Sequence, residues 1–395
     1  MKKICITGGR VVLPDGIKDI NIISEDGVIK ELCESIPDDA EIFDAKGKLI
    51  TPGFVEIHSH GAGGADFCDC TKEAFETVIK THLSHGTTLI CPTLMSSKTE
   101  KILEAFKIYR DVKKGQYGKF IHKIHLEGPY LNPDMCGAQR PDIIRYPSKE
   151  EVDKIFSEGG DIIGRIGAAP EICGIDYLIE NAKKNGIVMS VAHSSATAKE
   201  TDEAVAKGFN HVTHLYSATT SIRKINQRIC SGILEAAYLN DDMYVELIGD
   251  GRHISEEQMK LAIKIKSADR INLTSDSMRA AGQTGIEKSY LGEICEENAV
   301  IIEDGVAKLP DKSSYAGSIA TGDIMFKNAV CNYGISVLEA VKMLSETPAK
   351  IINESRKGSI SKGKDCDIVI WNDDFSVSDI FSMGELIKKR EGRFL

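Results

Sequence analysis

Apolar and polar residues alternate in short runs over the first fifty positions, a pattern typical of strands that expose one face. Turn signals such as Pro14-Asp15-Gly16 and Glu25-Asp26-Gly27 separate these runs. The runs predict five strands: Lys3–Thr7, Arg10–Leu13, Asp19–Ser24, Val28–Leu32 and Glu41–Asp44. A meander this short needs another sheet to cover its apolar face. The far end of the chain offers one, because a turn-rich stretch there leads into the apolar run Asp367–Trp371.

From residue 53 onward, strand-like runs alternate with segments whose apolar residues recur every three or four positions, as in amphipathic helices. The predicted strands are Val55–His60, Thr87–Pro92, Lys123–Gly128, Arg165–Ala169, Val188–His193, His211–Tyr216, Tyr244–Gly249 and Asn272–Asp276. The predicted helices are Glu73–His85, Thr99–Val112, Lys149–Ser157, Ile175–Asn185, Ala198–Lys207 and Glu256–Lys266. This rhythm favours a (β/α)8 TIM-like barrel over an open doubly wound sheet. We therefore predict a barrel over residues 53–355 and a small β-sandwich domain built from residues 1–52 and 356–395.

The stretch from Gly53 to Gly61 carries the first candidate chemistry. Its apolar run ends in His58 and His60 and then enters a glycine-rich loop. Side chains alternate along a strand, so both imidazoles should project the same way from its carboxyl end. Barrel enzymes keep their catalytic groups at that end. The spacing is common, however, and a packed core histidine next to a loop histidine explains it equally well.

Other predicted strands end in similar groups. The third strand ends near Glu127, and the fifth, sixth and eighth strands carry His193, His214 and Asp276 near their ends. If the barrel forms, four imidazoles and two carboxylates share its mouth, the end at which the strands terminate, and packing alone hardly explains that. Such donors suit a divalent metal such as zinc. Five histidines away from these positions are expected to be structural: His82, His85, His122, His125 and His211.

Composition narrows the class of protein. The chain has 395 residues, 42% of them apolar, and a formal net charge of −10. This charge argues against nucleic acid or an anionic membrane as a partner. The amino terminus lacks the apolar run of a signal peptide, and no later run is long enough to span a bilayer, so we expect a cytoplasmic protein. Eleven scattered cysteines predict free thiols.

The chain resembles the amidohydrolase superfamily and, within it, the N-acetylglucosamine-6-phosphate deacetylase family. The likeness runs nearly end to end, and the Leu-Glu-Gly-Pro motif at residues 126–129 is its most specific part. The other matching stretches are residues 52–61, 125–133, 169–171, 192–197, 213–216, 249–253, 274–276 and 316–318. The resemblance implies a metal-dependent barrel with a sandwich assembled from both termini, in agreement with the strand pattern. It also implies a homodimer that deacetylates an amino sugar.

The resemblance further implies which side chains hold metal. Glu127, His193 and His214 match the principal ligands of the family. His58 and His60 match a second, more exposed metal site that only some members possess. We therefore expect one or two divalent ions, with zinc as the expected metal.

Two further residues match the family's catalytic groups. Asp276 matches the catalytic carboxylate, and His253 matches a histidine that contacts substrate. Hydrolysis of an amide needs a strong nucleophile and a proton delivered to nitrogen. Coordination to a metal lowers the pKa of water to about 7. Asp276 can accept a proton from that water and later pass it to the departing amine.

Three departures from the family pattern concern the substrate. Gln139, after Ala138, stands where the family has a histidine that helps to polarise the acetyl carbonyl. Ser217, before Ala218, stands where an asparagine touches the sugar phosphate. Ile225 stands where an arginine reaches the phosphate of the neighbouring subunit's substrate. Loss of that arginine puts recognition of the 6-phosphate in doubt, although phosphate binding remains part of the leading hypothesis.

Nearby cations offer a replacement for the missing guanidinium. Arg223, Lys224 and Arg228 flank Ile225, and Arg223 and Arg228 are the candidates for contact with phosphate. A guanidinium can bind phosphate through two parallel hydrogen bonds. As surface charges, these side chains are equally explained by simple solvation.

Four hypotheses follow from these residues. The leading one is metal-dependent hydrolysis of the N-acetyl group of an amino sugar 6-phosphate. The second keeps this reaction but changes the substrate to an unphosphorylated or different N-acyl compound. The third is another amidohydrolase reaction, which the Leu-Glu-Gly-Pro motif and the absence of lysine from the fourth strand disfavour. The fourth is a non-catalytic binding protein, which the full set of metal-ligand residues and Asp276 disfavour.

Overall fold

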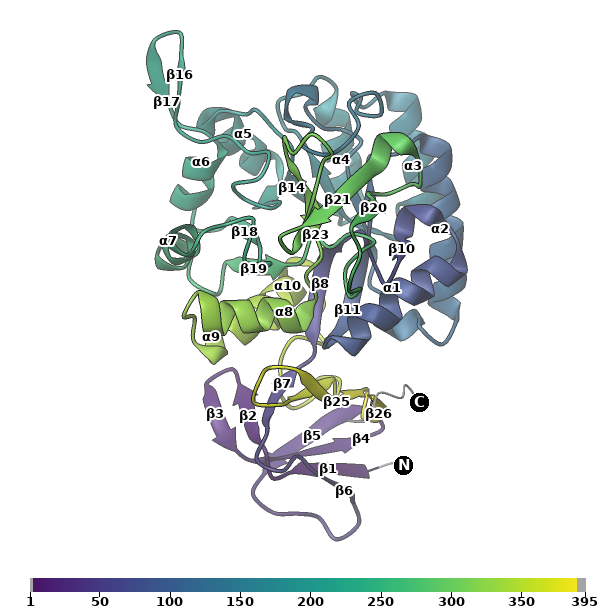
Figure 1. The fold of residues 1–395 in the computed structure, drawn as a ribbon, viewed down its shortest axis with the longest axis vertical. Coiled ribbons are helices and arrows are strands. Elements are labelled where there is room, and N and C mark those ends of the chain that lie inside the picture. Colours follow the sequence, from purple (N-terminus) through teal and green to yellow (C-terminus); the bar gives the residue numbers. More distant parts are fainter. Residues whose placement is uncertain (1–2, 389–395) are drawn as a thin grey trace.

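Eight parallel strands form a closed barrel at the centre of the computed structural model, which describes residues 3–388 (Figure 1). The barrel strands are β8 (Phe54–Ser59), β11 (Thr87–Met95), β12 (Ile124–Glu127), β13 (Ile163–Ala168), β14 (Val188–Val191), β15 (Phe209–Val212), β18 (Tyr244–Ile248) and β19 (Ile271–Thr274). They neighbour one another in chain order, and a parallel bridge between Ser59 and Ser277 joins the last to the first. Helices outside and side chains inside bury both faces, which explains the nearly continuous apolar runs. The predicted barrel and all eight of its strands are confirmed.

Helices cover the outside of the barrel. They are α1 (Lys72–Ser84), α2 (Thr99–Lys114), α3 (Lys149–Gly159), α4 (Ile175–Lys184), α5 (Ala198–Lys207), α6 (Ile233–Leu239), α7 (Glu256–Lys266), α8 (Gly322–Lys327), α9 (Val337–Val341) and α10 (Thr347–Ile351). The predicted helices correspond to α1–α5 and α7. Thr197 shows why such segments begin where they do, because its hydroxyl accepts from the Glu200 N–H while the Glu200 side chain accepts from the Thr197 N–H. None of the described helices has both the length and the apolar character needed to cross a bilayer.

Helical turns of other types complete this layer. Single 3-10 turns occur at Phe67–Asp69, Gly118–Phe120, Pro133–Met135 and Glu296–Asn298. Two π-helical turns, Asn328–Asn332 and Lys342–Glu346, alternate with α8, α9 and α10. The sequence did not predict this last helical stretch or α6.

The two ends of the chain form two sheets below the barrel (Figure 1). One sheet has the order β5-β4-β1-β6, and the other β26-β25-β24-β7-β2-β3. The strands are β1 (Lys3–Thr7), β2 (Arg10–Leu13), β3 (Gly16–Asp19), β4 (Asn21–Glu25), β5 (Val28–Cys33), β6 (Glu41–Asp44), β7 (Leu49–Pro52), β24 (Ile368–Trp371), β25 (Val377–Ser382) and β26 (Glu385–Lys388). Residues 1–2 and 389–395 of the predicted terminal domain lie outside the described residues. The division into two domains stays a prediction.

The predicted strand Asp19–Ser24 is wrong in its bounds. The chain passes from one sheet to the other at Ile20, so β3 ends before this residue and β4 begins after it. β3 pairs with β2, whereas β4 pairs with β1 and β5. Alternation of apolar residues continues across the crossing and therefore could not reveal it.

Trp371 joins the terminal sheets to the base of the barrel. Its indole stacks on Phe54, with ring centroids 5.3 Å apart, and lies 5.0 Å from the ring of Phe326. The indole N–H donates to the hydroxyl of Thr51 over 2.8 Å. Because Trp371 is buried, this apolar contact holds β8 at the barrel end opposite the mouth.

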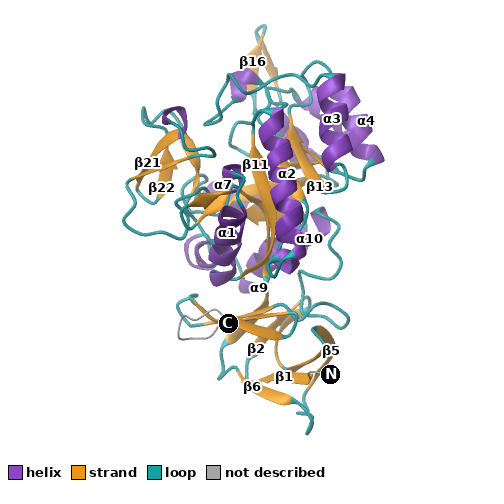
Figure 2. Ribbon diagram, turned by 90° about the vertical axis from the view of Figure 1, so that its right-hand side faces the viewer, coloured by secondary structure: helices purple, strands orange, loops and turns teal. Residues whose placement is uncertain are grey.

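Several small elements beyond the barrel were not predicted. A four-stranded antiparallel sheet lies beside the mouth, with β20 (Lys288–Tyr290), β21 (Ala299–Glu303), β22 (Val306–Lys308) and β23 (Tyr315–Ser318) (Figure 2). A hairpin of β16 (Arg223–Ile225) and β17 (Arg228–Cys230) projects from the molecule (Figure 1). A further short pair is β9 (Gly61–Ala62) and β10 (Ala65–Asp66). Strands of two to five residues give too little periodicity for detection in sequence.

Candidate metal centre and active site

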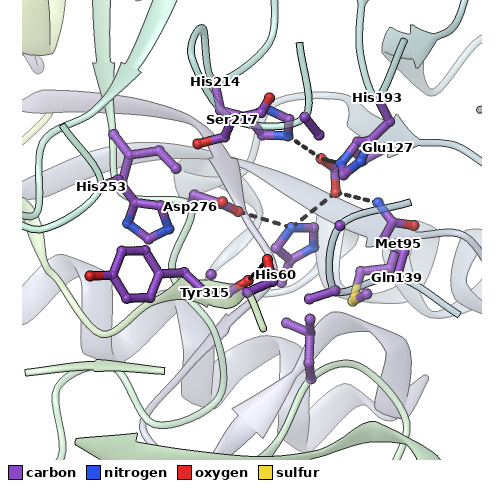
Figure 3. A pocket seen from close by; sticks show the side chains of 17 residues that line it. His60, Met95, Glu127, Gln139, His193, His214, Ser217, His253, Asp276 and Tyr315 are labelled. Carbon is purple, nitrogen blue, oxygen red and sulfur yellow. Dashed lines mark hydrogen bonds and ion pairs between the residues drawn. The ribbon is translucent and has the colours of Figure 1, made fainter. Parts of the chain in front are cut away.

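The six predicted groups of the barrel mouth come together in the structure. Figure 3 shows all of them except His58. They extend from the carboxyl ends of five strands: His58 and His60 from β8, Glu127 from β12, His193 from β14, His214 from β15 and Asp276 from β19. Potential ligand atoms of Glu127, His193 and His214 lie within 4.8 Å of one another, and so do those of His58, His60 and Glu127. Glu127 therefore belongs to both groups.

The first group is arranged around one oxygen of Glu127. Its Oε1 lies 3.1 Å from Nε2 of His193 and 2.8 Å from Nε2 of His214. The opposite nitrogens, both Nδ1, face main-chain carbonyls, at 2.8 Å for His193 with Met135 and 3.1 Å for His214 with Ser217. A carbonyl only accepts, so each Nδ1 carries a proton and each Nε2 presents a lone pair to the centre. This is the arrangement that metal-binding histidines adopt.

The second group is as deeply buried as the first. His58 is 0% exposed and His60 2% exposed, so the expected greater exposure of this site is wrong. The two Nε2 atoms lie 3.3 Å apart, and Nε2 of His60 lies 3.3 Å from Oε2 of Glu127. Asp276 approaches both rings, with Oδ1 3.2 Å from Nε2 of His60 and 3.4 Å from Nε2 of His58. The ring of His58 also packs against those of His125 and His214, with centroids 4.8 and 5.6 Å apart.

Charges within the centre shift its pKa values in opposite directions. Burial disfavours the cationic form of His60, but hydrogen bonds to Asp276 and Glu127 outweigh it and raise its pKa to about 9. For His58, the carboxylates of Glu246, Asp276 and Glu127 likewise outweigh burial and raise the pKa well above its ordinary value. Burial opposes ionisation of Glu127, yet the surrounding imidazoles hold its pKa well below the ordinary value. The centre thus favours positive charge between its carboxylates.

This donor set fits a divalent cation. Imidazole nitrogens and carboxylate oxygens that face one another within about 3–4 Å repel unless a proton or a cation lies between them. Nitrogen and oxygen ligands in this number accommodate zinc and several other divalent transition metals. The residues therefore fit one ion in each group, and the ligand roles predicted for them stay a proposal.

Three of the six groups lie on unusual backbone. His193, His214 and Asp276 have φ angles of 44°, 30° and 46°, in the left-handed region that residues with a Cβ rarely adopt. Each follows the end of its strand by two residues. Such conformations cluster at functional sites, where the surrounding structure compensates for the strain. Here they turn the side chains inward at the points where the chain leaves the barrel.

A cavity of about 190 Å³ opens at these groups. Predicted residues that line it are His60, Glu127, Ala138, Gln139, His193, His214, Ser217, Ala218, His253 and Asp276. Other lining residues were not foreseen, chiefly Met95, Ile248, Leu291 and Tyr315. Tyr315 lies on β23 of the small antiparallel sheet, and Leu291 lies in the turn after β20. No pattern in the sequence indicated that these segments lie near the mouth.

Comparison with known proteins identifies the type of barrel. Residues 49–387 match the model of the amidohydrolase family. The chain belongs to the amidohydrolase family. It is 31% identical to the N-acetylglucosamine-6-phosphate deacetylase of Haemophilus influenzae, over 92% of this chain and 93% of that protein. It is also 26% identical to the N-acetylgalactosamine-6-phosphate deacetylase of Escherichia coli O157:H7, over 95% and 97%.

Solved structures agree with this assignment. The N-acetylglucosamine-6-phosphate deacetylase of Pasteurella multocida superposes with a TM-score of 0.90 at 27% identity and covers 97% of this chain and 99% of its own. A point mutant of the Mycobacterium smegmatis N-acetyl-D-glucosamine-6-phosphate deacetylase, in complex with N-acetyl-D-glucosamine-6-phosphate, has a TM-score of 0.88 at 25% identity. That superposition covers 98% of this chain and 99% of the other.

In this amidohydrolase, Gln139 binds Glu127 directly. Its Nε2 donates to Oε2 of Glu127 over 2.9 Å, while its Oε1 accepts from the Ser96 N–H over 3.0 Å. The main-chain contact fixes which end of the amide faces the centre. Gln139 is buried, so it presents one N–H to the metal groups in place of the family's imidazole.

His253 reaches the cavity from the loop after β18. Its Nδ1 lies 2.7 Å from Oδ2 of Asp250, and its ring packs edge-on against Tyr315 with centroids 4.9 Å apart. Asp250 also accepts from the main-chain N–H groups of Arg252 and His253. These contacts fix the orientation of the imidazole at the cavity.

The structure does not bring Arg223 or Arg228 to the cavity of their own chain. Both lie on the β16–β17 hairpin, which projects away from the barrel (Figure 1). The Arg223 guanidinium donates to the main-chain carbonyl of Ser195, and Arg228 is exposed. Among the described residues that line the cavity, none is a lysine or an arginine. The hairpin geometry therefore separates these two cations from the other predicted substrate residues.

Proposed function

We propose that this amidohydrolase removes the N-acetyl group of an amino sugar 6-phosphate and converts N-acetylglucosamine-6-phosphate to glucosamine-6-phosphate and acetate. The observation that carries the proposal is the convergence of Asp276 and two potential metal groups on one cavity. Relatives with end-to-end similarity are named for deacetylation of such sugars. The retained chemistry and the named relatives thus point to the same reaction.

Glu127, His193 and His214 would hold the catalytic metal, and His58 and His60 would hold a second ion together with Glu127. Zinc suits these ligands. When bound, such a cation supplies the Lewis acidity that activates water and polarises an amide carbonyl. Gln139 keeps one oxygen of Glu127 in place through its own hydrogen bond.

Asp276 would move the proton. Its carboxylate is nearly buried and lies against the two imidazoles of β8. Burial opposes its ionisation, but His58 and His60 outweigh this effect and keep its pKa below the ordinary value. As a base it takes a proton from the attacking water, and as an acid it gives that proton to the departing nitrogen.

Recognition of the sugar would come from groups on the other side of the cavity. His253, fixed by Asp250, presents Nε2, and Ser217 and Ala218 line the wall beside His214. Since the described lining residues include no lysine or arginine, a second copy of the chain would supply an arginine from its projecting hairpin. Exposed Ile222 and Ile229 beside Arg223 and Arg228 suit such an interface. We therefore propose that the protein is a homodimer. We also propose that it is located in the cytoplasm.

The kinds of side chain that line the cavity support one alternative. Without a lysine or arginine among the described lining residues, the chain's own cavity suits an unphosphorylated N-acetyl substrate as well. Retained catalytic groups with altered recognition groups would then give the same hydrolysis on a different N-acyl compound.

A direct comparison of rates separates the two. Purified protein loaded with Zn²⁺ is assayed with N-acetylglucosamine, its 6-phosphate and the two galactosamine counterparts. Loss of one charge-assisted contact costs about 1.5–3 kcal/mol, so kcat/KM should favour the phosphates by at least roughly tenfold. Equal rates for the unphosphorylated sugars would support the alternative. No release of acetate from any of the four would contradict deacetylation of these sugars.

A further inference from the structure

A buried glutamate below the mouth contacts both potential metal groups. Glu246 lies on β18, points into the barrel and is 0% exposed. Its Oε1 lies 2.7 Å from Nδ1 of His58 and accepts from the main-chain N–H of His214 over 3.2 Å. One carboxylate oxygen therefore touches the imidazole of one group and the backbone of the other.

The second oxygen of Glu246 is held from below. Oε2 accepts from Nη1 of Arg165 over 2.8 Å and from Nδ2 of Asn272 over 3.3 Å. Arg165 is itself buried and donates to the hydroxyls of Ser190 and Thr213 and to the carbonyl of Ile57. The guanidinium is thus fixed on all sides, and it fixes the carboxylate in turn.

The four groups that hydrogen-bond to Glu246 are donors or can act as donors, and Nε2 of His211 lies 4.0 Å from its Oε2. A carboxylate only accepts, so the hydrogen bond to His58 requires the proton on Nδ1. The lone pair of Nε2 then points toward His60, Glu127 and Asp276. A partner on the outer ring nitrogen is the usual device that sets the tautomer and orientation of a metal-binding histidine.

We propose that Glu246 is a positioning residue that fixes the tautomer and ring orientation of His58 and so forms the second cation site with His60 and Glu127. Arg165 and Asn272 hold Glu246 for this purpose. The inference rests on the metal centre of the proposed function. It extends that proposal by naming the residue that orients a ligand of the second site. Glu246 touches no reacting atom.

Glu246→Gln provides the test because it keeps the shape of the side chain. The amide has one accepting and one donating end, so its NH₂ must face either His58 and His214 or Arg165 and Asn272, all of which are donors. Equilibrium dialysis against Zn²⁺, with metal analysis, measures the ions bound per chain. We expect two ions in the wild type, and in the variant one tight ion with the second bound about 10–100-fold more weakly.

Glu56→Gln is the matched control. Glu56 is also a buried carboxylate of the barrel, 2% exposed, but it accepts from the main-chain N–H of His58 and Ser275 and from the Thr274 hydroxyl. It has no contact with the His58 ring. Its replacement should lower stability and leave both zinc ions bound. Loss of the second ion in both variants to the same extent would overturn the assignment to Glu246.

A spectroscopic measurement on the wild type keeps the inference testable even if the variant does not fold. Protein labelled with ¹⁵N only at histidine and loaded with Zn²⁺ is examined by ¹H–¹⁵N NMR, and the His58 signals are assigned by their loss in His58→Gln. We expect the proton on Nδ1. A proton on Nε2 instead, or a wild type that binds one ion at saturation, would overturn the inference. Deacetylase activity tests the proposed function separately, since the Glu127–His193–His214 ion does not depend on this outcome.

Discussion

His60 and His82 are equally buried, but their surroundings give them opposite chemistry. His60, at the mouth, faces the carboxylates of Glu127 and Asp276, and its pKa is raised to about 9. His82, on α1, faces the hydroxyls of Ser59 and Ser277 at 2.9 and 3.2 Å, and burial lowers its pKa to about 3. Burial alone makes an imidazole neutral and structural. Converging carboxylates, rather than depth, distinguish the histidines of the candidate active site.

The difference arises from alternation along one strand. His58 and His60 point into the mouth, whereas Ser59, between them, points outward and meets His82. The same backbone thus positions a potential metal ligand on one face and a structural hydrogen bond on the other. Each prediction below changes one side of this comparison.

Removal of an imidazole from the mouth should have the largest effect. His193→Ala removes one of three ligands proposed for the catalytic metal, so the tight ion should be lost. Because a metal supplies several kcal/mol of transition-state stabilisation, kcat/KM should fall by about 10⁴-fold or more. Metal analysis and acetate release measure both effects. His82→Gln is the control and should keep the metal; full retention of the ion in His193→Ala would disprove the ligand assignment.

Replacement of Asp276, a carboxylate of the mouth that is not a proposed metal ligand, should have the next largest effect. Asp276→Asn should keep the fold and the metal but lower kcat by about 10²–10⁴, the usual contribution of general acid–base catalysis. Steady-state kinetics with parallel metal analysis provide the measurement. A decrease smaller than tenfold would mean that another group transfers the proton.

The arginines of the projecting hairpin concern binding of the substrate rather than the chemical step at the mouth. Arg228→Ala and Arg223→Ala should raise KM for a 6-phosphate substrate by about one to two powers of ten with little change in kcat. Arg228 should have the larger effect because Arg223 already donates to the Ser195 carbonyl. Arg110→Ala, at a partly exposed arginine paired with Asp161, is the control. If neither hairpin variant changes KM, these arginines do not bind phosphate.

The smallest effect should come from the structural histidine. The unfolded chain takes up a proton on His82 near pH 6.5, whereas the folded protein does so only near pH 3. The unfolded state therefore binds more protons in this window, so stability is present above pH 6.5 and is lost as the pH falls toward 3. At pH 5.5 the loss is about 1.4 kcal/mol. Thermal unfolding of His82→Gln should show a flatter decline between pH 6.5 and 5 than the wild type; parallel declines would contradict the assignment.

The sequence by itself determined the barrel and the list of groups at its mouth. All eight strands were predicted because parallel strands buried on both faces are continuous apolar runs between amphipathic helices. Each functional group ends such a run, and the carboxyl ends of parallel strands in a barrel must meet at one end. Convergence of Glu127 and Asp276 with four imidazoles therefore followed from local pattern and topology.

Only the tertiary structure decided what surrounds those groups. The contact of His58 with Glu246 joins residues 188 positions apart, and nothing local to either residue indicates it. The contact of Gln139 with Glu127, the burial of His60 and the place of Tyr315 beside His253 likewise depend on closure of the barrel and on loops that pack over it. Periodicity along a chain reports which face a side chain occupies, but not which distant side chain meets it there, because that pairing is set by the packing of the whole fold.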